Sequence, residues 1–246
     1  MMLEARNLSV RFGGLAAVDD VSLAVPRGKI VALIGPNGAG KTTVFNLVSG
    51  FIRPDHGRVE LEGRDITRIS PHEACRLGMA RTFQIVQPFG AQTVRENIAV
   101  GAHLHHGSRA DALRAAEAVG ERVGLAAHLD KLAANLTIAG RKRLELARAL
   151  ATQPKILLLD EVLAGLNPRE IDEVLPVVRG IRDGGITVLM VEHVLRAVMN
   201  LSDEAWVLSN GRLIAHGTPR EVTADPAVIE AYLGHGTAAR MKAAYA

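Results

Sequence analysis

A glycine-rich stretch from Gly35 to Thr43 has the residue types needed to hold a chain of phosphates. It reads Gly35, Pro36, Asn37, Gly38, Ala39, Gly40, Lys41, Thr42 and Thr43, and it matches the pattern G-x-x-x-x-G-K-[ST]. Backbone N–H groups can wrap a polyphosphate only where the chain adopts φ values that glycine reaches at little cost. Lys41 would place a positive charge on the outer phosphates, and the Thr42 hydroxyl would bind Mg²⁺.

Two acids follow an apolar run later in the chain. The run Ile156–Leu159 is typical of a buried central strand, and it leads directly into Asp160 and Glu161. An aspartate at such a strand end can hold Mg²⁺ through water, and the next acid can accept a proton from an attacking water. Taken alone, the pair could be a solvated strand end. The phosphate-binding pattern upstream favours the catalytic interpretation.

Two further polar residues lie at places where they could assist hydrolysis. His193 follows the expected strand Thr187–Val191 and could contact a γ-phosphate, although an ordinary surface histidine would fit the same place. Gln84 follows Arg81, Thr82 and Phe83, and its amide could reach Mg²⁺ or the attacking water. By itself the sequence around Gln84 does not choose between these roles.

These residues must be positioned by alternating strands and helices. Apolar strands near residues 29–34, 156–160 and 187–191 are each followed by a helical pattern, which predicts an α/β fold with a mainly parallel sheet. The N-terminal stretches 3–12 and 17–25 alternate like antiparallel strands. Helical spacing at Asp111–Val123 and Arg141–Ala151 predicts a helical insertion.

Composition bounds the remaining choices. Apolar residues make up 48% of the 246 residues, and the formal net charge is +3. This is the composition of a folded globular protein, and so weak a charge argues against a nucleic-acid partner. The single cysteine, Cys75, is consistent with a reducing compartment. The longest apolar runs are far shorter than the roughly 20 residues that span a bilayer, so another chain would provide any membrane part.

The order of these motifs resembles the ATPase subunits of ABC transporters, and among them the branch that imports branched-chain (hydrophobic) amino acids. The resemblance covers nearly the whole chain. Its matching stretches are Arg11–Leu15, Gly35–Phe45, Arg81–Gln84, Arg143–Arg148, Ala164–Pro168, Val191–His193 and Ala231–Gly234. It implies a P-loop NTPase core with an N-terminal antiparallel β-subdomain, residues 1–84 and 151–233, and a helical signature subdomain, residues 85–150. Residues 234–246 would be a flexible tail.

The resemblance also implies roles for individual residues. Phe12 would stack on the adenine of ATP, and the stretch Gly35–Thr43 would hold its phosphates and Mg²⁺. Asp160 would be the metal-linked acid and Glu161 the catalytic acid. Gln84 would sense Mg²⁺ and link the ATP site to the membrane subunit, and His193 would be the switch that responds to the γ-phosphate.

In this family a Leu-Ser-Gly-Gly-Gln loop closes the nucleotide of an opposing subunit, and here the sequence departs from the pattern. Counting back from Leu144 without gaps gives Leu136, Thr137, Ile138, Ala139 and Gly140. Thr137 keeps a hydroxyl where serine is expected. Either Ala139 or Gly140 could make the contact expected of glycine. Two smaller departures are Val162 in place of proline and Asn167 in place of aspartate.

Partners follow from the same resemblance. A second ATPase subunit, either another copy or a paralogue, would complete the two sites. Transmembrane permease subunits would dock near Ile85–Thr93, where Ile85, Val86 and Phe89 are apolar. A substrate-binding protein would act indirectly, and the chain would lie in the cytoplasm on the inner face of the membrane.

Two alternatives stay open at the level of sequence. The ATPase of a lipopolysaccharide-export system would fit the stretch Leu213–Pro219 equally well, while Gln84 and His193 in their contexts favour the importer. A soluble ABC ATPase acting on nucleic acid or ribosomes usually carries two ATPase domains or a long coiled insertion, and neither is evident in this sequence.

Overall fold

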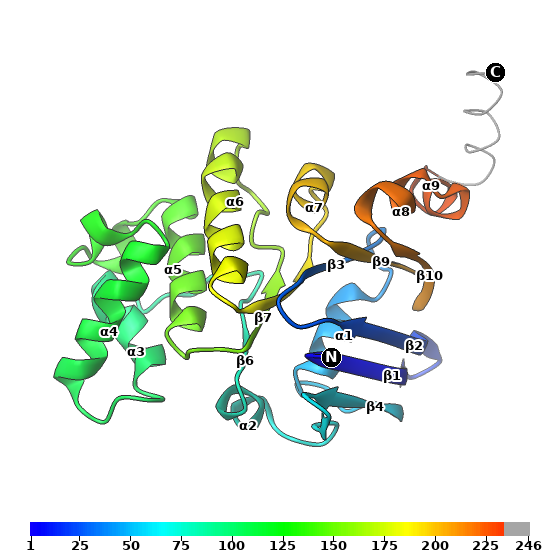
Figure 1. Cartoon of the computed structure of the whole chain (residues 1–246), viewed down its shortest axis with the longest axis horizontal. Coiled ribbons are helices and arrows are strands. Elements are labelled where there is room, and N and C mark those ends of the chain that lie inside the picture. Colours follow the sequence, from blue (N-terminus) through cyan, green and yellow to red (C-terminus); the bar gives the residue numbers. More distant parts are fainter. Residues whose placement is uncertain (234–246) are drawn as a thin grey trace. The chain divides into compact units, whose positions relative to one another are not determined.

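The computed structural model describes residues 1–233, which form two compact units (Figure 1). The first unit consists of Met1–Pro71 and the described residues from Leu189 onward. The second unit is His72–Val188. The tail expected at residues 234–246 lies outside the described residues. The expected division into a core and a helical subdomain at residues 85–150 stays a prediction.

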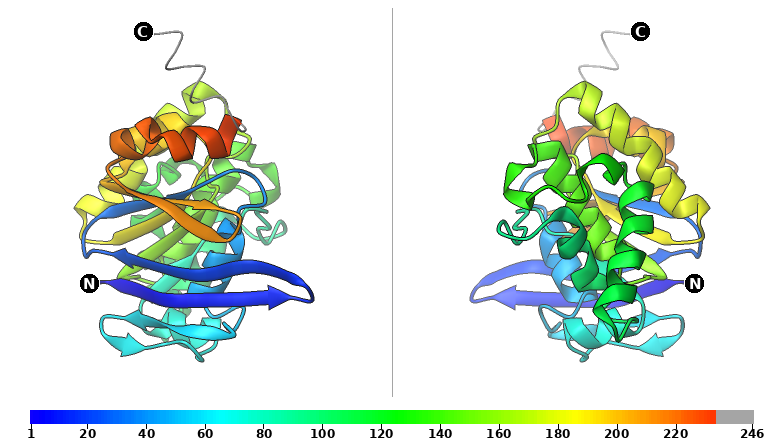
Figure 2. Two further views of the ribbon diagram at one scale, coloured as in Figure 1. Left: turned by 90° about the vertical axis from the view of Figure 1, so that its right-hand side faces the viewer. Right: turned by 90° about the vertical axis from the view of Figure 1, so that its left-hand side faces the viewer.

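An antiparallel sheet occupies the N-terminal half of the first unit. Its strand order is β2-β1-β4-β5, and Leu3 lies opposite both Val25 of β2 and Leu61 of β4. Inward positions such as Leu8 and Val10 are buried while the residues between them are more exposed, as the alternation of the sequence predicts. Figure 2 shows β1 and β2 as a long hairpin beside β4. The strands are β1 (Leu3–Phe12), β2 (Leu15–Val25), β4 (His56–Leu61) and β5 (Arg64–Asp65).

A second set of strands in the first unit has the order β10-β9-β3-β8. All five residues of β3 are buried, which is the property of a central strand, and β3 runs parallel to β9. The pair of β9 and β10 is antiparallel, as a hairpin around Gly211 requires. The strands are β3 (Ile30–Ile34), β8 (Thr187–Val191), β9 (Glu204–Ser209) and β10 (Arg212–Gly217). The helices are α1 (Lys41–Val48), α7 (Leu195–Leu201), α8 (Pro219–Ala224) and α9 (Pro226–Leu233).

The second unit combines a short parallel pair of strands with a group of helices. Strands β6 and β7 run parallel, with Met79 opposite Ile156 and Arg81 opposite Leu158. Helices α3, α4 and α5 pack together, as Figure 2 shows in green. The strands are β6 (Met79–Arg81) and β7 (Ile156–Asp160). The helices are α2 (Pro71–Arg76), α3 (Val94–Ala102), α4 (Arg109–Arg122), α5 (Ile138–Leu150) and α6 (Pro168–Asp183).

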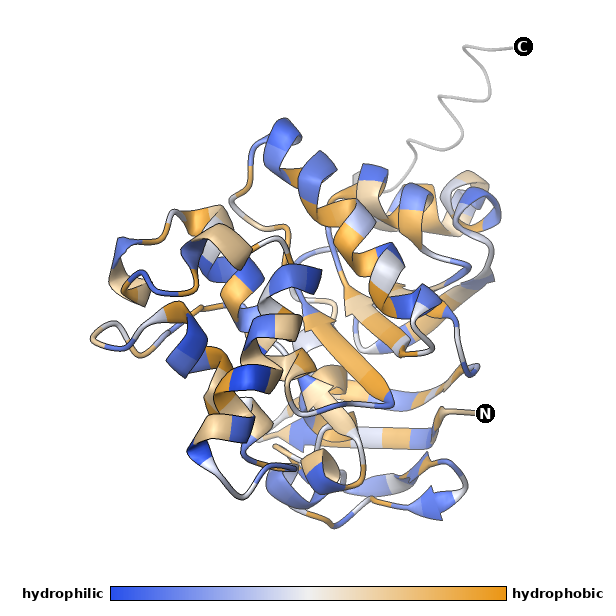
Figure 3. Cartoon of the chain, turned by 60° about the vertical axis from the view of Figure 1, so that its left-hand side comes forward, coloured by the Kyte–Doolittle hydropathy of each residue, from blue (hydrophilic) through white to orange (hydrophobic). Residues whose placement is uncertain are grey.

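Helix α6 illustrates how local sequence fixes an element of the second unit. Its buried residues recur at helical spacing: Ile171, Val174, Leu175, Val178 and Ile181. Asn167 caps the helix by accepting a hydrogen bond from the N–H of Glu170, whose carboxylate accepts one from the N–H of Asn167 in return. Figure 3 shows apolar strands, and helices whose turns alternate between apolar and polar residues.

Most expected elements agree with the structure, and the differences have local causes. Helix α5 begins at Ile138 rather than Arg141, because the Thr137 side chain caps it by accepting a hydrogen bond from the N–H of Gly140 at 3.1 Å. Strand β6 is too short to produce a visible alternation in the sequence. Within residues 1–233 no helix combines the length and the apolar character that crossing a membrane requires.

We expect Thr93→Ala to destabilise the protein, because Thr93 forms a reciprocal capping box with Glu96 at the start of α3. Loss of such a cap costs about 1 kcal/mol. Urea unfolding monitored by circular dichroism would measure the change. Thr93→Ser keeps the hydroxyl and serves as the control. Equal stability of Thr93→Ala and the wild-type protein would contradict the role of the cap.

Candidate functional site

The phosphate loop of the first unit depends on glycine at two close approaches of the backbone. A Cβ added to Gly35 would lie 2.0 Å from the carbonyl oxygen of Leu208, and one added to Gly40 would lie 2.5 Å from that of Ala17. Gly38 has open space around it but adopts a φ of 79°. The loop therefore has the backbone shape that the sequence pattern predicts.

The end of this loop has the features of an anion site. Helix α1 begins after Gly40 with no side chain capping its N-terminus, so its first N–H groups and its positive end are directed at the loop. The Lys41 ammonium is buried and donates to the carbonyl oxygens of Gly35 at 2.8 Å and Pro36 at 2.9 Å. Thr42 is exposed. A polyphosphate with Mg²⁺ fits this set of N–H groups, ammonium and hydroxyl.

Phe12 lies at the end of β1, where it pairs with Leu15 across the turn of the hairpin. About half of its surface, 51%, is exposed. An exposed aromatic ring offers a flat apolar face, which suits the stacking of a base.

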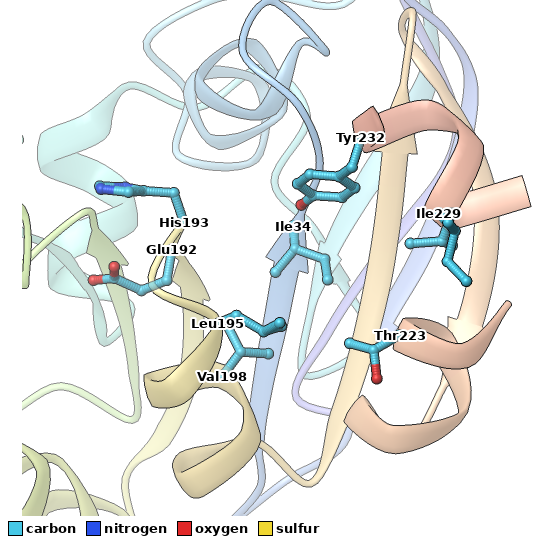
Figure 4. A pocket seen from close by; sticks show the side chains of 9 residues that line it. Ile34, Glu192, His193, Leu195, Val198, Thr223, Ile229 and Tyr232 are labelled. Carbon is cyan, nitrogen blue, oxygen red and sulfur yellow. The ribbon is translucent and has the colours of Figure 1, made fainter. Parts of the chain in front are cut away.

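His193 follows β8 in the first unit and is exposed, whereas Glu192 beside it is buried. Both line a cavity of about 420 Å³ whose other walls come from β3, α7, α8 and α9. In Figure 4 the side chains of Glu192 and His193 extend away from α9, while Tyr232 of α9 lies beside Ile34 at the end of β3. His193 is therefore accessible to a ligand, as its predicted role requires.

Tyr232 makes a contact with the phosphate loop that the sequence did not reveal. Burial raises the pKa of the Tyr232 phenol, and the nearby backbone N–H of Gly35 acts in the opposite direction. Helix α9 thus brings the Tyr232 phenol close to the first residue of the phosphate loop. The sequence singled out the stretch around Tyr232 only by its resemblance.

In the second unit the structure brings two predicted site residues together. The Gln84 amide nitrogen donates to a carboxylate oxygen of Glu161 at 2.8 Å, although 77 residues separate them in the sequence. Glu161 follows β7 with a φ of 49°, which is the left-handed region that non-glycine residues seldom adopt. The side chains of Gln84 and Glu161 therefore form one polar group at the end of β7.

Asp160 is held by two neighbours, Arg81 at the end of β6 and Thr82, the residue that follows β6. Its carboxylate accepts a hydrogen bond from the Arg81 guanidinium at 2.7 Å, and both side chains are buried. Its N–H donates to the Thr82 hydroxyl at 3.1 Å. Burial of a carboxylate is costly unless an opposite charge and hydrogen bonds satisfy it, as the Arg81 guanidinium does here. Arg81 and Thr82 were recognised in the sequence only as part of a matching stretch, without these contacts.

The loop expected to meet an opposing nucleotide opens helix α5. Thr137 and Ile138 are exposed, and Ala139 is buried. The N–H of Gly140 already donates to the Thr137 hydroxyl. Together with the start of α6 at Asn167, this loop borders a polar cavity of about 450 Å³ in the second unit.

The segment Ile85–Thr93 carries apolar side chains at the surface of the second unit. Ile85 is 74% exposed and Phe89 is 46% exposed. Its backbone is nevertheless held in place. The buried Asn97 side chain of α3 accepts a hydrogen bond from the N–H of Phe89 at 2.9 Å and donates to the carbonyl oxygen of Thr93 at 2.9 Å. An exposed apolar surface on a fixed backbone is typical of a docking site.

Sequence comparison with protein families and curated proteins finds extensive similarity. A family described as "ABC transporter" matches residues 18–164, and one described as "Branched-chain amino acid ATP-binding cassette transporter" matches residues 212–238. The chain is 42% identical to the high-affinity branched-chain amino acid transport ATP-binding protein LivG of Salmonella typhimurium, over 95% of this chain and 98% of that protein. It is 40% identical to the corresponding protein BraF of Pseudomonas aeruginosa, with the same coverage.

Solved structures agree with the fold. A nucleotide-free ATP-binding cassette from an ABC transporter matches with a TM-score of 0.87 and 34% identity, over 95% of this chain and 99% of that one. The ADP conformation of an ATP-binding cassette of an ABC transporter matches with a TM-score of 0.87 and 35% identity over the same shares. The predicted α/β fold with its antiparallel sheet and helices is confirmed.

We expect Gly35→Ala to disrupt the phosphate loop, because the added Cβ would collide with the carbonyl oxygen of Leu208. Thermal unfolding should show a large loss of stability. Gly38→Ala is the matched control. It meets no atom within 4 Å, so it adds only the cost of its positive φ, about 1–2 kcal/mol. Equal melting temperatures for the two variants would contradict this account of the loop.

Proposed function

Because this chain belongs to the ATP-binding subunits of ABC transporters, in the branched-chain amino acid branch, we propose that it powers the import of branched-chain or related hydrophobic amino acids. The observation that carries the proposal is its 40–42% identity, along nearly the full length, to proteins named for branched-chain amino acid transport. As a member of this family the chain binds nucleotide and is an ATPase coupled to transport.

In the first unit we assign the binding of ATP. Phe12 would stack on adenine, and the loop Gly35–Thr43 would hold the phosphates through its N–H groups and Lys41. The Thr42 hydroxyl would be a ligand of Mg²⁺. His193 would contact the γ-phosphate, and its exposure at the end of β8 supports this role.

In the second unit we assign the residues of hydrolysis. Asp160 would hold Mg²⁺ through water, and Glu161 would accept the proton of the attacking water. Gln84 would bind Mg²⁺ or position that water. Its hydrogen bond to Glu161 supports a shared task, since both side chains would then act on one water.

We propose that the working assembly contains a second ATPase subunit, either another copy or a paralogue. Thr137, Ala139 and Gly140 would meet the nucleotide held by that subunit, because the N-terminus of a helix such as α5 favours an anion. A post-hydrolysis ATP-binding cassette of the same fold, 20% identical to this chain, is dimeric.

Permease subunits would dock on the segment Ile85–Thr93, and a substrate-binding protein would act through them. The exposed Ile85 and Phe89 on a backbone fixed by Asn97 support this assignment. Docking would place the chain at the cytoplasmic face of the membrane. Nucleic acid is not among the partners that we propose.

The two alternatives left open by the sequence are not favoured. The stretch Leu213–Pro219, which would also fit lipopolysaccharide export, lies inside the region matched by the branched-chain amino acid transporter family. The second alternative is a soluble ABC ATPase that acts on nucleic acid or ribosomes. The relatives that are 40–42% identical to this chain are named for amino acid transport instead.

We expect Glu161→Gln to bind Mg-ATP with nearly wild-type affinity but to lose hydrolysis, because the amide cannot accept the proton of water. Two such subunits should then remain associated around ATP. Calorimetry, a phosphate-release assay and analytical ultracentrifugation would measure these three properties. Lys41→Ala is the comparison variant, which should lose ATP affinity instead. A monomeric Glu161→Gln protein at saturating Mg-ATP would contradict the assignment.

Uptake of radiolabelled leucine, isoleucine and valine by cells that lack the gene tests the transported substrate. Wild-type protein should restore uptake, and Glu161→Gln should not. Proline and glutamate serve as comparison substrates. Restored uptake of an unrelated solute alone, with ATPase activity intact, would disprove the substrate while leaving the ATPase assignment in place.

A further inference from the structure

One side of helix α5 carries three charged residues at intervals of three: Lys142, Glu145 and Arg148. Lys142 and Arg148 donate to backbone carbonyl groups of the segment that begins at Phe83. The Arg148 guanidinium donates to the carbonyl oxygen of Gln87 at 3.3 Å and lies 5.0 Å from the centre of the Phe89 ring. Residues three apart share one face of a helix, so α5 contacts this segment along one continuous row.

Glu145 is the middle member of this row. Burial raises the pKa of its carboxyl group, whereas Arg148, the N–H of Phe83 and Lys142 act in the opposite direction. Its carboxylate thus lies near the backbone N–H immediately before Gln84. The contact with Arg148 at 3.3 Å gives the buried acid a positive partner.

Lys142 is the first member of the row, and its ammonium reaches Glu161. Its buried ammonium donates to the carbonyl oxygens of Gln84 and Glu161, each at 3.2 Å. Gln84 and Glu161 are also the residues whose side chains bond to each other. One buried cation therefore holds the backbone of both.

The consequence for Glu161 is geometric. Its φ of 49° is an unusual backbone conformation, which persists only where surrounding contacts determine it. The ammonium of Lys142 at its carbonyl oxygen is such a contact. A buried ammonium needs acceptors, so displacement of either carbonyl oxygen would leave the charge less well satisfied.

We propose that Lys142 is a positioning residue for hydrolysis, which holds Gln84 and Glu161 in register with each other through their backbone carbonyl groups. The inference rests on the proposed roles of those two residues. Because Lys142 lies in α5, a displacement of α5 would move both residues together. Lys142 does not itself contact the nucleotide in this account.

Lys142→Met tests the proposal in the full-length protein. We expect kcat for ATP hydrolysis to fall by roughly ten- to hundredfold, since small misplacements of catalytic groups have effects of this size. The affinity for Mg-ATP, measured by calorimetry, should change little. Lys142→Arg keeps a cationic donor and should recover most of kcat. Arg114→Met removes a positive charge from an exposed position on α4 and should leave kcat unchanged.

A second measurement separates positioning from a general loss of stability. If Lys142 acts through Gln84 and Glu161, Lys142→Met should lower kcat less in a Gln84→Ala background than in the wild-type protein. The hydrogen bond between Gln84 and Glu161 is already absent in that background. An additive effect on kcat in that background would overturn the proposal. So would a wild-type kcat in Lys142→Met. Lys142→Gln, which keeps a neutral donor, replaces the methionine variant if the latter does not fold.

Amide hydrogen exchange tests the same contacts without relying on ATPase activity. Lys142→Met should accelerate exchange in peptides covering residues 83–87 and 161–164, whereas Arg114→Met should not. Unchanged exchange in both peptides would overturn the inference. A wild-type protein without ATPase activity would instead disprove the proposed function, and the exchange result would still decide whether Lys142 holds the two segments.

Discussion

The carbonyl oxygen of Leu208 lies 2.0 Å from the place that a Cβ of residue 35 would occupy. This close approach of two backbones determines where the phosphate loop leaves β3, and only glycine is compatible with it. The loop that follows brings the Lys41 ammonium onto the carbonyl oxygens of Gly35 and Pro36 and starts α1 with an uncapped N-terminus. The Tyr232 phenol of α9 lies close to the backbone N–H of Gly35. Backbone geometry thus prepares the site for an anion.

In the second unit, the irregular backbone at Gln84 and Glu161 must be held in place at the end of β7. Buried positive side chains do this. Arg81 pairs with Asp160, and Lys142 bonds to the carbonyl oxygens of Gln84 and Glu161. Buried charges are tolerated only where partners satisfy them, so each cation also restricts the positions of its acceptors. The polar group at the end of β7 is therefore held by residues from β6 and α5.

The same logic extends to the exposed segment that follows Gln84. Its apolar side chains face solvent, while Asn97 and Arg148 bond to its backbone. A partner that binds Ile85 and Phe89 would therefore meet a surface that is already ordered. Little conformational entropy would then be lost on docking. This combination supports a permease interface more strongly than exposed apolar residues alone.

The sequence by itself predicted the glycine-dependent backbone of the loop Gly35–Thr43, the buried strand that ends at Asp160, and most other strands and helices. These features depend on neighbouring residues, through glycine conformations, apolar periodicity and helix caps. Only the tertiary structure decided how Gln84 meets Glu161, how Arg81 meets Asp160 and how Lys142 joins two carbonyl groups. Such contacts join residues as far as 79 positions apart in the sequence. The sequence next to a buried charged residue does not identify the residue with which it pairs. Chain topology places those groups together, and the need to satisfy each buried charge then selects the bonds.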